Sequence, residues 1–274
     1  MREVRVASRG PLARVEGFRG TVHAVFARSV YLVPTSGPLL VIHDAAHGHT
    51  PTSCLVDDAR PADWGVRPGD RAAGRLGRLR VGDVVLDARH TRLWQPAPAP
   101  HTASPAPRRD RLAGTCGRAD ARVGAACRRL SGALARGDAP EARGALAALV
   151  GAGPGLTPSG DDAAVGLLAV LHRALPTAPV AGPLDLVRAI VPSLLHRTTT
   201  ISAHYLTLGR DGWFGEHLTV LVDACLRGNG VEPALVARVL GIGATSGADA
   251  LVGVDAGLSL VGALLRTRGL EDAA

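Results

Sequence analysis

The segment SGDDAAVGLLAVL, residues 159–171, recurs as SGADALVGVDAGL at residues 246–258. Eight of the 13 aligned positions are identical, at a constant offset of 87 (246 − 159). Each copy follows a Gly-x-Gly sequence, and its apolar residues recur with the spacing of a helix. The repeat therefore predicts one helix from Ser159 to about Leu175 and another from Ser246 to Arg266. If the repeat is a duplication, two equivalent loop-to-helix turns are expected to face each other across a pseudo-twofold axis.

The sequence around the repeat also has helical periodicity. Further helices are expected over 138–150, 183–195, 199–208, 215–227 and 233–240. Aromatic residues make up only 3% of the chain, so its cores must be filled by Ala, Val and Leu, which suits closely packed helices. We therefore predict a mainly helical C-terminal domain, residues 108–274, that contains the internal repeat.

The first 95 residues have a different pattern. Short β-branched runs, separated by turn residues, predict strands over 21–27, 30–33, 39–42, 53–56, 71–76 and 84–87. Such strands favour a small β-barrel or sandwich over residues 1–95. Residues 96–107, PAPAPHTASPAP, are typical of a semi-rigid linker. The expected fold class is therefore α+β, a β-rich domain followed by a helical one.

The charge and composition of the chain limit the kinds of ligand and partner that it can bind. The net charge is +7, and none of the 31 basic residues is lysine. Arginines, hydroxyls or backbone N–H groups must therefore hold any bound anion. The arginines are scattered apart from a cluster around Arg108, Arg109 and Arg111, and aromatic residues are few, which argues against nucleic acid as a partner. The most apolar stretch, residues 244–265, contains two aspartates, and the chain begins without an apolar signal segment. We expect a cytoplasmic protein without a membrane partner.

The strongest chemical signal precedes the first copy of the repeat. The loop GAGPGLTPSGDD, residues 151–162, has four glycines that permit close approach of a ligand to the backbone. With Ser159 as the N-cap, the first N–H groups of the helix would bind a phosphate or carboxylate. Asp161 and Asp162 could orient a metal or a protonated nitrogen. The alternative is a capping box between Ser159 and Asp162.

Two further segments could bind an anion. In HRTTTIS, residues 196–202, an arginine precedes hydroxyls at a helix start, although this is also the pattern of an ordinary Thr-capped helix. In GATSGAD, residues 243–249, the second copy repeats the first, with an N-cap as the alternative. Three histidines at positions 43, 47 and 49 have only loosely metal-like spacing, and no metal site is predicted there.

The motifs GAGPGLTPSGDD, HRTTTISA and GATSGADALVG, in this order, resemble the bacterial family DUF2877. The likeness covers residues 149–265 well and the β-rich region loosely. The family includes a subunit of the oxamate carbamoyltransferase of anaerobic allantoin breakdown, a step of nitrogen metabolism. The resemblance implies an enzyme or enzyme subunit that transfers a carbamoyl or related carboxyl-derived group. Its substrates would be phosphate or carbamoyl phosphate and a small amide or ureido acid, with other subunits as partners.

On this resemblance, three side chains are catalytic candidates, Asp162, Arg197 and Asp249. Arg197 would hold the phosphate, the loop N–H groups would hold a carboxylate or a second phosphate, and the two aspartates would orient the nucleophilic nitrogen or Mg²⁺. The substrate-binding candidates are Gly153, Gly155, Thr157, Ser159, Gly160, Asp161, Thr198, Thr199, Thr245 and Ser246. Thr198 and Thr199 would hold the phosphate together with Arg197. The loop N–H groups in question are those near Gly155, Ser159 and Gly160.

Two other functions stay open at this point. One is a non-catalytic regulatory subunit that binds a nucleotide or metabolite. The other is an ATP-dependent ligase or carboxylase; the absence of lysine counts against a P-loop, though not against every ATP site. No cofactor is assigned from the sequence, and Mg²⁺ or a nucleotide is left open.

Overall fold

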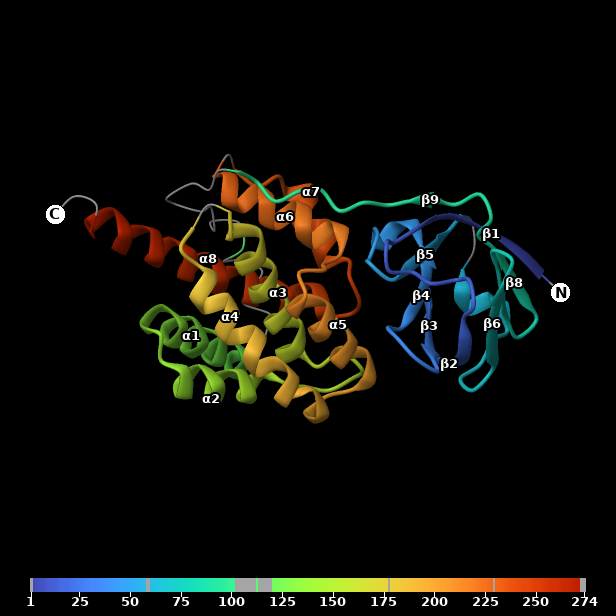
Figure 1. Ribbon diagram of the computed structural model, residues 1–274, viewed down its shortest axis with the longest axis horizontal. Coiled ribbons are helices and arrows are strands. Elements are labelled where there is room, and N and C mark those ends of the chain that lie inside the picture. The colour runs from blue at the N-terminus through green and yellow to red at the C-terminus, as the bar shows by residue number, and fades with distance from the viewer. Residues whose placement is uncertain are drawn as a thin grey trace. The chain divides into compact units, whose positions relative to one another are not determined.

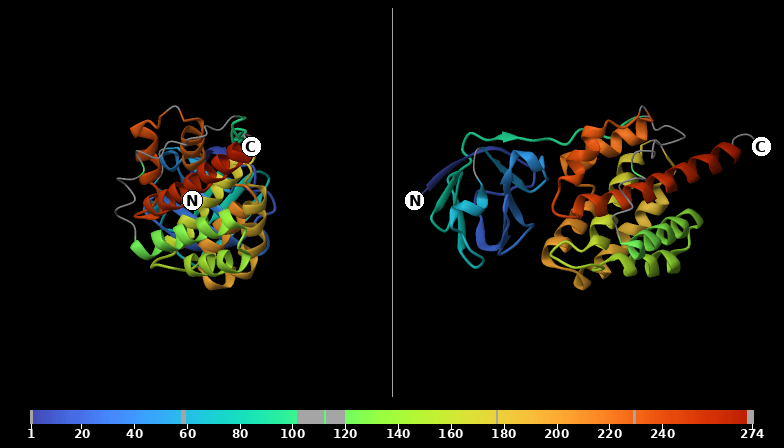
Figure 2. Two further views of the ribbon diagram at one scale, coloured as in Figure 1. Left: turned by 90° about the vertical axis from the view of Figure 1, so that its left-hand side faces the viewer. Right: turned by 180° about the vertical axis from the view of Figure 1, so that it is seen from behind.

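The computed structural model describes residues 2–57, 60–101, 112, 120–176, 178–228 and 230–271, with side chains as far as residue 267. It divides into two compact units, Met1–Ala97 and Pro98–Ala274. The sequence-predicted linker, residues 96–107, spans this boundary, and its residues 102–107 lie outside the described part. Residues 108–111 and 113–119, at the start of the predicted helical domain, also lie outside it. Figures 1 and 2 show the elements of each unit.

The first unit is a β-barrel. Its strands are β1 (Arg2–Arg9), β2 (Arg19–Val25), β3 (Ser29–Pro34), β4 (Leu40–Asp44), β5 (Ser53–Val56), β6 (Arg71–Arg75), β7 (Arg78–Val81), β8 (Val84–Asp87) and β9 (Arg92–Leu93). They pair in the order β5-β4-β3-β2-β6-β7-β8-β1, and β1 closes the barrel by pairing with β5. The short β9 adds to β1 in parallel. The prediction of a small barrel is confirmed, and the sandwich alternative is wrong.

Alternation along β6 and β7 separates the interior of the barrel from its outer face. In β6, buried Ala72 lies between exposed Arg71 and Ala73. In β7, buried Leu79 and Val81 alternate with exposed arginines. The interior is filled by fully buried aliphatic side chains, including Leu32, Ile42, Leu79 and Leu86. The 3-10 helices η1 (Ala45–His47) and η2 (Pro61–Trp64) lie in the connections between strands.

The second unit is helical. Its α-helices are α1 (Ala121–Arg136), α2 (Ala139–Leu149), α3 (Ser159–Ala174), α4 (Ala181–Ile190), α5 (Thr200–Arg210), α6 (Glu216–Arg227), α7 (Pro233–Leu240) and α8 (Ser246–Glu271), with 3-10 turns η4 (Val191–Ser193) and η5 (Leu195–Arg197). Helix α3 lies at the centre of this unit (Figure 1), where it packs against α1, α2, α4, α5, α6 and α8.

Helices α3 and α8, which carry the two copies of the repeat, cross at reciprocal glycines. A Cβ atom at Gly166 would lie 2.1 Å from the carbonyl oxygen of Ala250, and one at Gly253 would lie 1.7 Å from that of Ala163. The offset of 87 exchanges these two contacts, since 166 + 87 = 253 and 163 + 87 = 250. The predicted pseudo-twofold relation is therefore visible in the helix packing, and only glycine permits backbones to approach so closely.

Several elements differ from the sequence prediction. The prediction missed α1, β1, β7 and β9. Helix α4 ends at Ile190 rather than Leu195, and Pro192 in the following 3-10 turn lacks the N–H that a continued helix needs. By length and composition, residues Ser246–Thr267 of α8 could cross a membrane. Most of the apolar stretch within this range is buried inside the unit, as in the core helix of a helical domain.

Candidate functional site

The glycine-rich loop joins α2 to α3. Gly151, Gly153 and Gly155 have φ values of 79°, 116° and 90°, in the left-handed region that favours glycine. A Cβ atom at Gly151 would lie 2.3 Å from the carbonyl oxygen of Arg197, so the HRTTT segment packs against the start of the loop. The first two predicted segments are therefore neighbours in space.

Asp161 fastens the loop to this neighbouring segment. Its side chain is buried, with a residue exposure of 1%. One carboxylate oxygen accepts the N–H of Gly151 at 2.9 Å, and the other accepts the hydroxyl of Thr198. Burial raises the pKa of Asp161, while hydrogen bonds from Thr198, Gly151 and Ser202 act in the opposite direction. Asp161 and Thr198 thus form a structural latch.

Thr199 provides a second latch. It is the N-cap of α5, where its hydroxyl accepts the N–H of Ser202 at 3.1 Å and donates to the carbonyl of Leu156 at 2.5 Å. The interpretation of a Thr-capped helix is confirmed. The latches hold the loop at both ends, while Arg197 is solvent-exposed beside it.

The start of α3 differs from the predicted capping box. The N-cap is Pro158, which makes no side-chain cap bond, and Ser159 is the first helical residue. The Ser159 N-cap and its pairing with Asp162 are therefore wrong. The carbonyl of Pro158 accepts the N–H groups of Asp161 at 2.9 Å and of Asp162 at 3.2 Å.

Of the backbone N–H groups predicted to bind an anion, one is already used in a hydrogen bond within the protein. The N–H of Gly160 donates to the carbonyl of Ala152 at 2.9 Å, so it is committed to the loop itself. Within the described residues, the N–H groups of Gly155 and Ser159 donate to no backbone carbonyl outside the helices. These two groups remain the candidates for an anion.

The two helix starts bring Asp162 and Asp249 into one acidic pair. Each has a buried Oδ2 atom without a hydrogen-bond partner, and Asp249 is only 3% exposed. Burial raises the pKa of Asp162 to about 8. Ser246 lowers that pKa by hydrogen bonding, the nearby Asp249 and Asp161 raise it, and Thr157 lowers it by a hydrogen bond. At neutral pH the Asp162 carboxyl is therefore protonated.

A hydroxyl pair joins the two copies beside this acidic pair. The Oγ1 atom of Thr157, before α3, lies 2.9 Å from the Oγ atom of Ser246, the first residue of α8. Each helix start also packs against the preceding helix through the glycine that follows its serine. A Cβ atom at Gly160 would lie 2.0 Å from the carbonyl of Leu149, and one at Gly247 would lie 1.9 Å from that of Val239.

The remaining candidates lie at the edges of this arrangement. Gly153 and Thr245 are exposed, and the backbone at Gly153 turns so sharply that a Cβ atom there would lie 2.8 Å from the nitrogen of Ser159. The carbonyl of Thr245 accepts the N–H of Asp249 at 2.9 Å. Thr157, Ser246, Asp162 and Asp249 thus come together, with Asp161, Thr198 and Thr199 fixing the loop around them.

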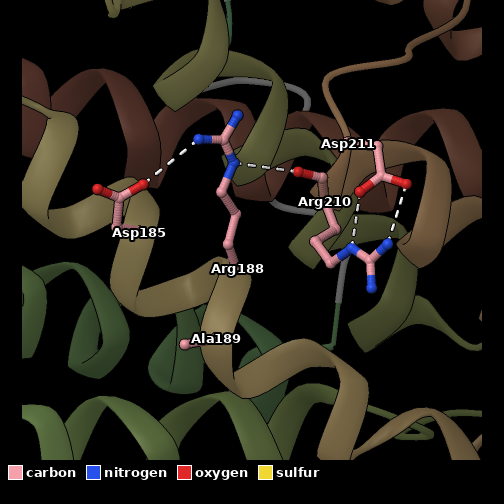
Figure 3. Close-up of a pocket in the computed structure, with 5 residues that line it drawn as sticks. All are labelled: Asp185, Arg188, Ala189, Arg210 and Asp211. Atoms are coloured by element: carbon pink, nitrogen blue, oxygen red, sulfur yellow. Dashed lines mark hydrogen bonds and ion pairs between the residues drawn. The ribbon is translucent and has the colours of Figure 1, made fainter.

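The sequence did not single out a shallow pocket of about 610 Å³ elsewhere in the helical unit (Figure 3). Arg188 contacts Asp185 at 3.3 Å, and Arg210 binds Asp211 at 2.7 and 3.0 Å. Each arginine is therefore neutralised by an acid close to it in sequence. The signal for both pairs was local, an i,i+3 spacing in α4 and adjacent residues at the end of α5.

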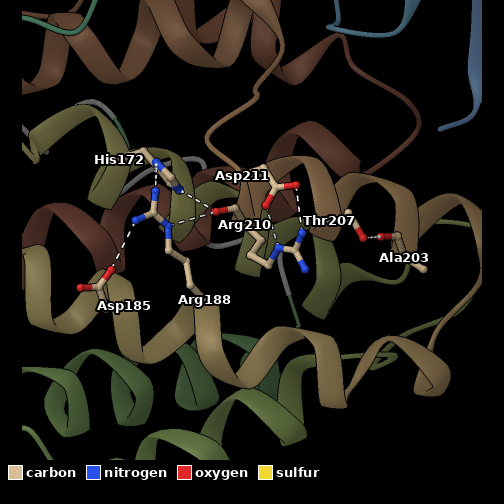
Figure 4. A network of polar contacts seen from close by, with 7 residues as sticks. All are labelled: His172, Asp185, Arg188, Ala203, Thr207, Arg210 and Asp211. Carbon is tan, nitrogen blue, oxygen red and sulfur yellow. Dashed lines mark hydrogen bonds and ion pairs between the residues drawn. The ribbon is translucent and has the colours of Figure 1, made fainter. Parts of the chain in front are cut away.

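His172 extends this network (Figure 4). Its Nε2 lies 3.2 Å from the carbonyl oxygen of Arg210, and its Nδ1 lies 3.5 Å from the Arg188 guanidinium. Burial and the positive charge of Arg188 lower the pKa of His172 to about 4. A neutral ring that donates to a carbonyl and faces a guanidinium through its other nitrogen holds α3 against the end of α5.

The histidines of the barrel show other environments. Burial lowers the pKa of His43 to about 4, and its Nδ1 lies 3.0 Å from the carbonyl oxygen of Asp44. His49 stacks on Trp94, with ring centroids 5.1 Å apart. Within the described residues, no three potential metal ligands cluster.

Comparison with known families gives two matches. The family model for the oxamate carbamoyltransferase subunit AllH matches residues 149–258, and the model for the AllH family N-terminal domain matches residues 5–93. The first covers both copies of the repeat, and the second covers the barrel. No curated protein and no solved structure matches significantly.

Proposed function

The chain belongs to the AllH family, and from this premise we propose that it supplies the acidic pair and the glycine-rich loop to the active site of a carbamoyltransferase. Family membership supports the role of a carbamoyltransferase subunit. The observation that carries the assignment of the site is the convergence of Asp162 and Asp249, each with a buried oxygen that has no partner in the described structure.

Unpartnered buried carboxyl oxygens need a donor, because an unsatisfied buried polar group costs about 1–3 kcal/mol. The N–H groups of an amide or ureido acid are donors of the right kind. A cation fits less well, because the positive ends of two helix dipoles meet at this place and two carboxyl groups are few for a metal. We therefore assign the pair to the nitrogen that gains or loses the carbamoyl group, rather than to Mg²⁺.

Protonated Asp162 suits the cleavage of an N-carbamoyl acid by phosphate. A phosphate oxygen attacks the carbamoyl carbon, the bond from that carbon to the substrate nitrogen breaks, and the nitrogen takes a proton from Asp162. The products are carbamoyl phosphate and the free amide. In the opposite direction, ionised Asp162 accepts the proton from the attacking nitrogen. Asp249 holds the nitrogen through a second N–H.

The phosphate side is assigned to Arg197 and to the N–H groups of Gly155 and Ser159. Arg197 is exposed, and its backbone packs against Gly151 at the start of the loop. A guanidinium forms the two parallel hydrogen bonds that phosphate accepts. The hydroxyls of Thr198 and Thr199 are engaged in the latches, so we assign these residues to positioning the loop.

The test uses the chain assembled with its partner subunits. Asp162→Asn should reduce carbamoyl transfer by about 10²–10⁴-fold, the usual contribution of a general acid, while Asp185→Asn, at an exposed site in the same unit, should leave it unchanged. Calorimetry on the isolated chain should show weaker phosphate binding for Arg197→Gln but not for Arg238→Gln. Full transfer activity in the folded Asp162→Asn variant would show that this chain is not the catalytic one, which would favour a regulatory subunit.

A further inference from the structure

A second hollow, of about 690 Å³, lies on the outer face of the β-barrel. It is formed by the β6–β7 hairpin and by the segment that runs from η2 into β6. Ala73 faces outward from β6 and pairs with Arg80 on β7, so a small side chain lies beside a long one. Gly65 and Gly82 add no side chain to the rim. The sequence thus leaves the outer face open here.

Three arginines, Arg67, Arg71 and Arg80, converge on this hollow from the turn and from both strands. All three are exposed, and within the described residues none forms an ion pair. The Nε of Arg80 donates to the carbonyl of Gly82 at 3.0 Å, which orients the guanidinium and leaves its terminal N–H groups free. We name this hollow the barrel arginine pocket.

The acids at the pocket do not neutralise these arginines. Asp70 is engaged in the turn, where its carboxylate accepts the N–H of Arg67 at 2.7 Å. Asp83 is exposed at the rim. Three positive side chains against two negative ones leave an excess of one positive charge. The pocket in the helical unit is different, because there each arginine already binds an aspartate (Figure 3).

The wall beside the arginines is apolar. Trp64 and Val66, each 7% exposed, contribute buried side chains to the lining. A volume of this size suits a ligand as large as a nucleotide, since small-molecule sites span roughly 300–1,000 Å³. Free guanidinium groups next to an apolar wall fit a ligand with several anionic oxygens and an uncharged part.

We propose that the barrel arginine pocket binds a small oligophosphate, with a nucleoside di- or triphosphate as the largest ligand that it accommodates. Guanidinium forks match the oxygens of phosphate, and the chain has no lysine that could take this role. None of the residues belongs to the acidic pair, the glycine-rich loop or Arg197. The pocket is therefore a second site, and its existence does not depend on the proposed carbamoyl transfer.

The experiment is isothermal calorimetry on the full chain with tripolyphosphate and with ADP as separate probes. Arg71→Gln and Arg80→Gln should each weaken binding at least about tenfold, in line with the loss of one charge-assisted contact. Arg75→Gln, on the same strand but outside the pocket, is the matched control. Ala73→Phe fills the hollow without changing the charge and should also weaken binding. All variants are compared by circular dichroism to confirm the barrel fold.

The two probes separate the two sources of the phosphate. Tighter binding of tripolyphosphate than of ADP would assign the pocket to inorganic oligophosphate, and ADP binding at least as tight, in spite of its lower charge, would assign it to a nucleotide. Either result supports the site if Arg71→Gln and Arg80→Gln weaken binding. The proposal is overturned if neither probe binds at millimolar concentration, or if Arg75→Gln weakens binding as much as Arg80→Gln does.

Discussion

The beginnings of α3 and α8 are two versions of one structure. In both, a Ser-Gly pair opens the helix and an aspartate follows three residues after the serine. In both, the glycine after the serine presses against a carbonyl of the preceding helix. Farther along, Gly166 and Gly253 meet the opposite helix at reciprocal positions. The parts that pack the two helices together are therefore shared by the two copies.

The connections that lead into the two helices differ. Nine residues, 150–158, separate α2 from α3, whereas five residues, 241–245, separate α7 from α8. The first copy has Asp161, which binds the loop and Thr198, where the second has Ala248. The comparison indicates that the helix interface kept the symmetry of the repeat, while a longer, latched loop developed on one side only. If this division is correct, substitutions at the shared packing contacts should reduce stability more than substitutions at the latched loop.

The largest effect is expected where the copies share their packing. Gly253→Val should destabilise the helical unit by about 3 kcal/mol or more, since overpacking here moves two backbones rather than a flexible side chain. Gly166→Val should have a similar effect, and the double variant should cost less than the sum, because both act on one interface. The measurement is the free energy of unfolding in urea.

Gly144→Ala is the control for glycine replacement. Gly144 is exposed in α2, and a Cβ atom there would have no neighbour within 4 Å. This variant should gain roughly 0.5–1 kcal/mol from helix propensity. A Gly253→Val protein as stable as Gly144→Ala would show that α3 and α8 do not pack through these glycines.

The second effect concerns the chemistry at the junction of the copies. Folding raises the pKa of Asp162 from 3.8 to about 8, so the folded protein keeps a proton that the unfolded chain loses. The stability contributed by this group is thus present at low pH and is lost as the pH rises towards 8. Relative to wild type, Asp162→Asn should gain stability between pH 5 and pH 8, by up to about 1.4 kcal/mol per pH unit.

The partner across the repeat should share in this behaviour. Asp249→Asn removes a negative charge that raises the pKa of Asp162, so the pH dependence of stability should weaken. Urea unfolding at four pH values, for wild type and both variants, measures the difference. Parallel curves for wild type and Asp162→Asn would contradict a raised pKa.

The sequence predicted the two-part fold because its periodicity changes near residue 95, and six strands of the barrel follow the turn signals. It missed β1, although the buried Val4 and Val6 alternate with polar residues there. It missed α1, although the buried residues Val123, Cys127, Leu130 and Leu134 recur there with helical spacing between arginines. Closure of the barrel by β1 and β5 depends on long-range pairing that no local pattern contains.

At the candidate site, the repeat predicted which side chains correspond, and the structure shows which ones share surroundings. The sequence pattern could not tell a capping serine from a first helical residue, because the two differ by a single position and the helix has Pro158 as its N-cap. Nor could it reveal that the Thr198 hydroxyl and Asp161 bind each other, since they are 37 residues apart. The barrel arginine pocket depends in the same way on the pairing of β6 with β7.

A smaller effect is expected at the latch that distinguishes the first copy. Asp161→Ala leaves the Gly151 N–H and the Thr198 hydroxyl without their acceptor, which should cost about 1–3 kcal/mol. Thr198→Val should cost less, and the pair should be non-additive because the two residues form one contact. Urea unfolding measures all three, with Asp185→Asn as an exposed control. Additive losses would mean that the latch is not a single unit.

The smallest effect tests whether the two copies meet at one site. Removing one hydroxyl of the Thr157–Ser246 contact, by Ser246→Ala, should cost about 1 kcal/mol, the usual net value of such a hydrogen bond. Ser259→Ala is the matched control, since that hydroxyl binds the carbonyl of Asp255 within the same helix.

Stability alone cannot separate these variants, but the titration of Asp162 can. Ser246 lowers the pKa of Asp162, so its removal should move that pKa above 8, whereas Ser259→Ala should not change it. Carboxyl carbon chemical shifts, followed by NMR against pH, report the pKa directly. An unchanged Asp162 titration in Ser246→Ala would mean that the hydroxyl of Ser246 does not bind the Asp162 carboxyl, and the contact between the two copies would then be limited to Asp249 and the helix packing.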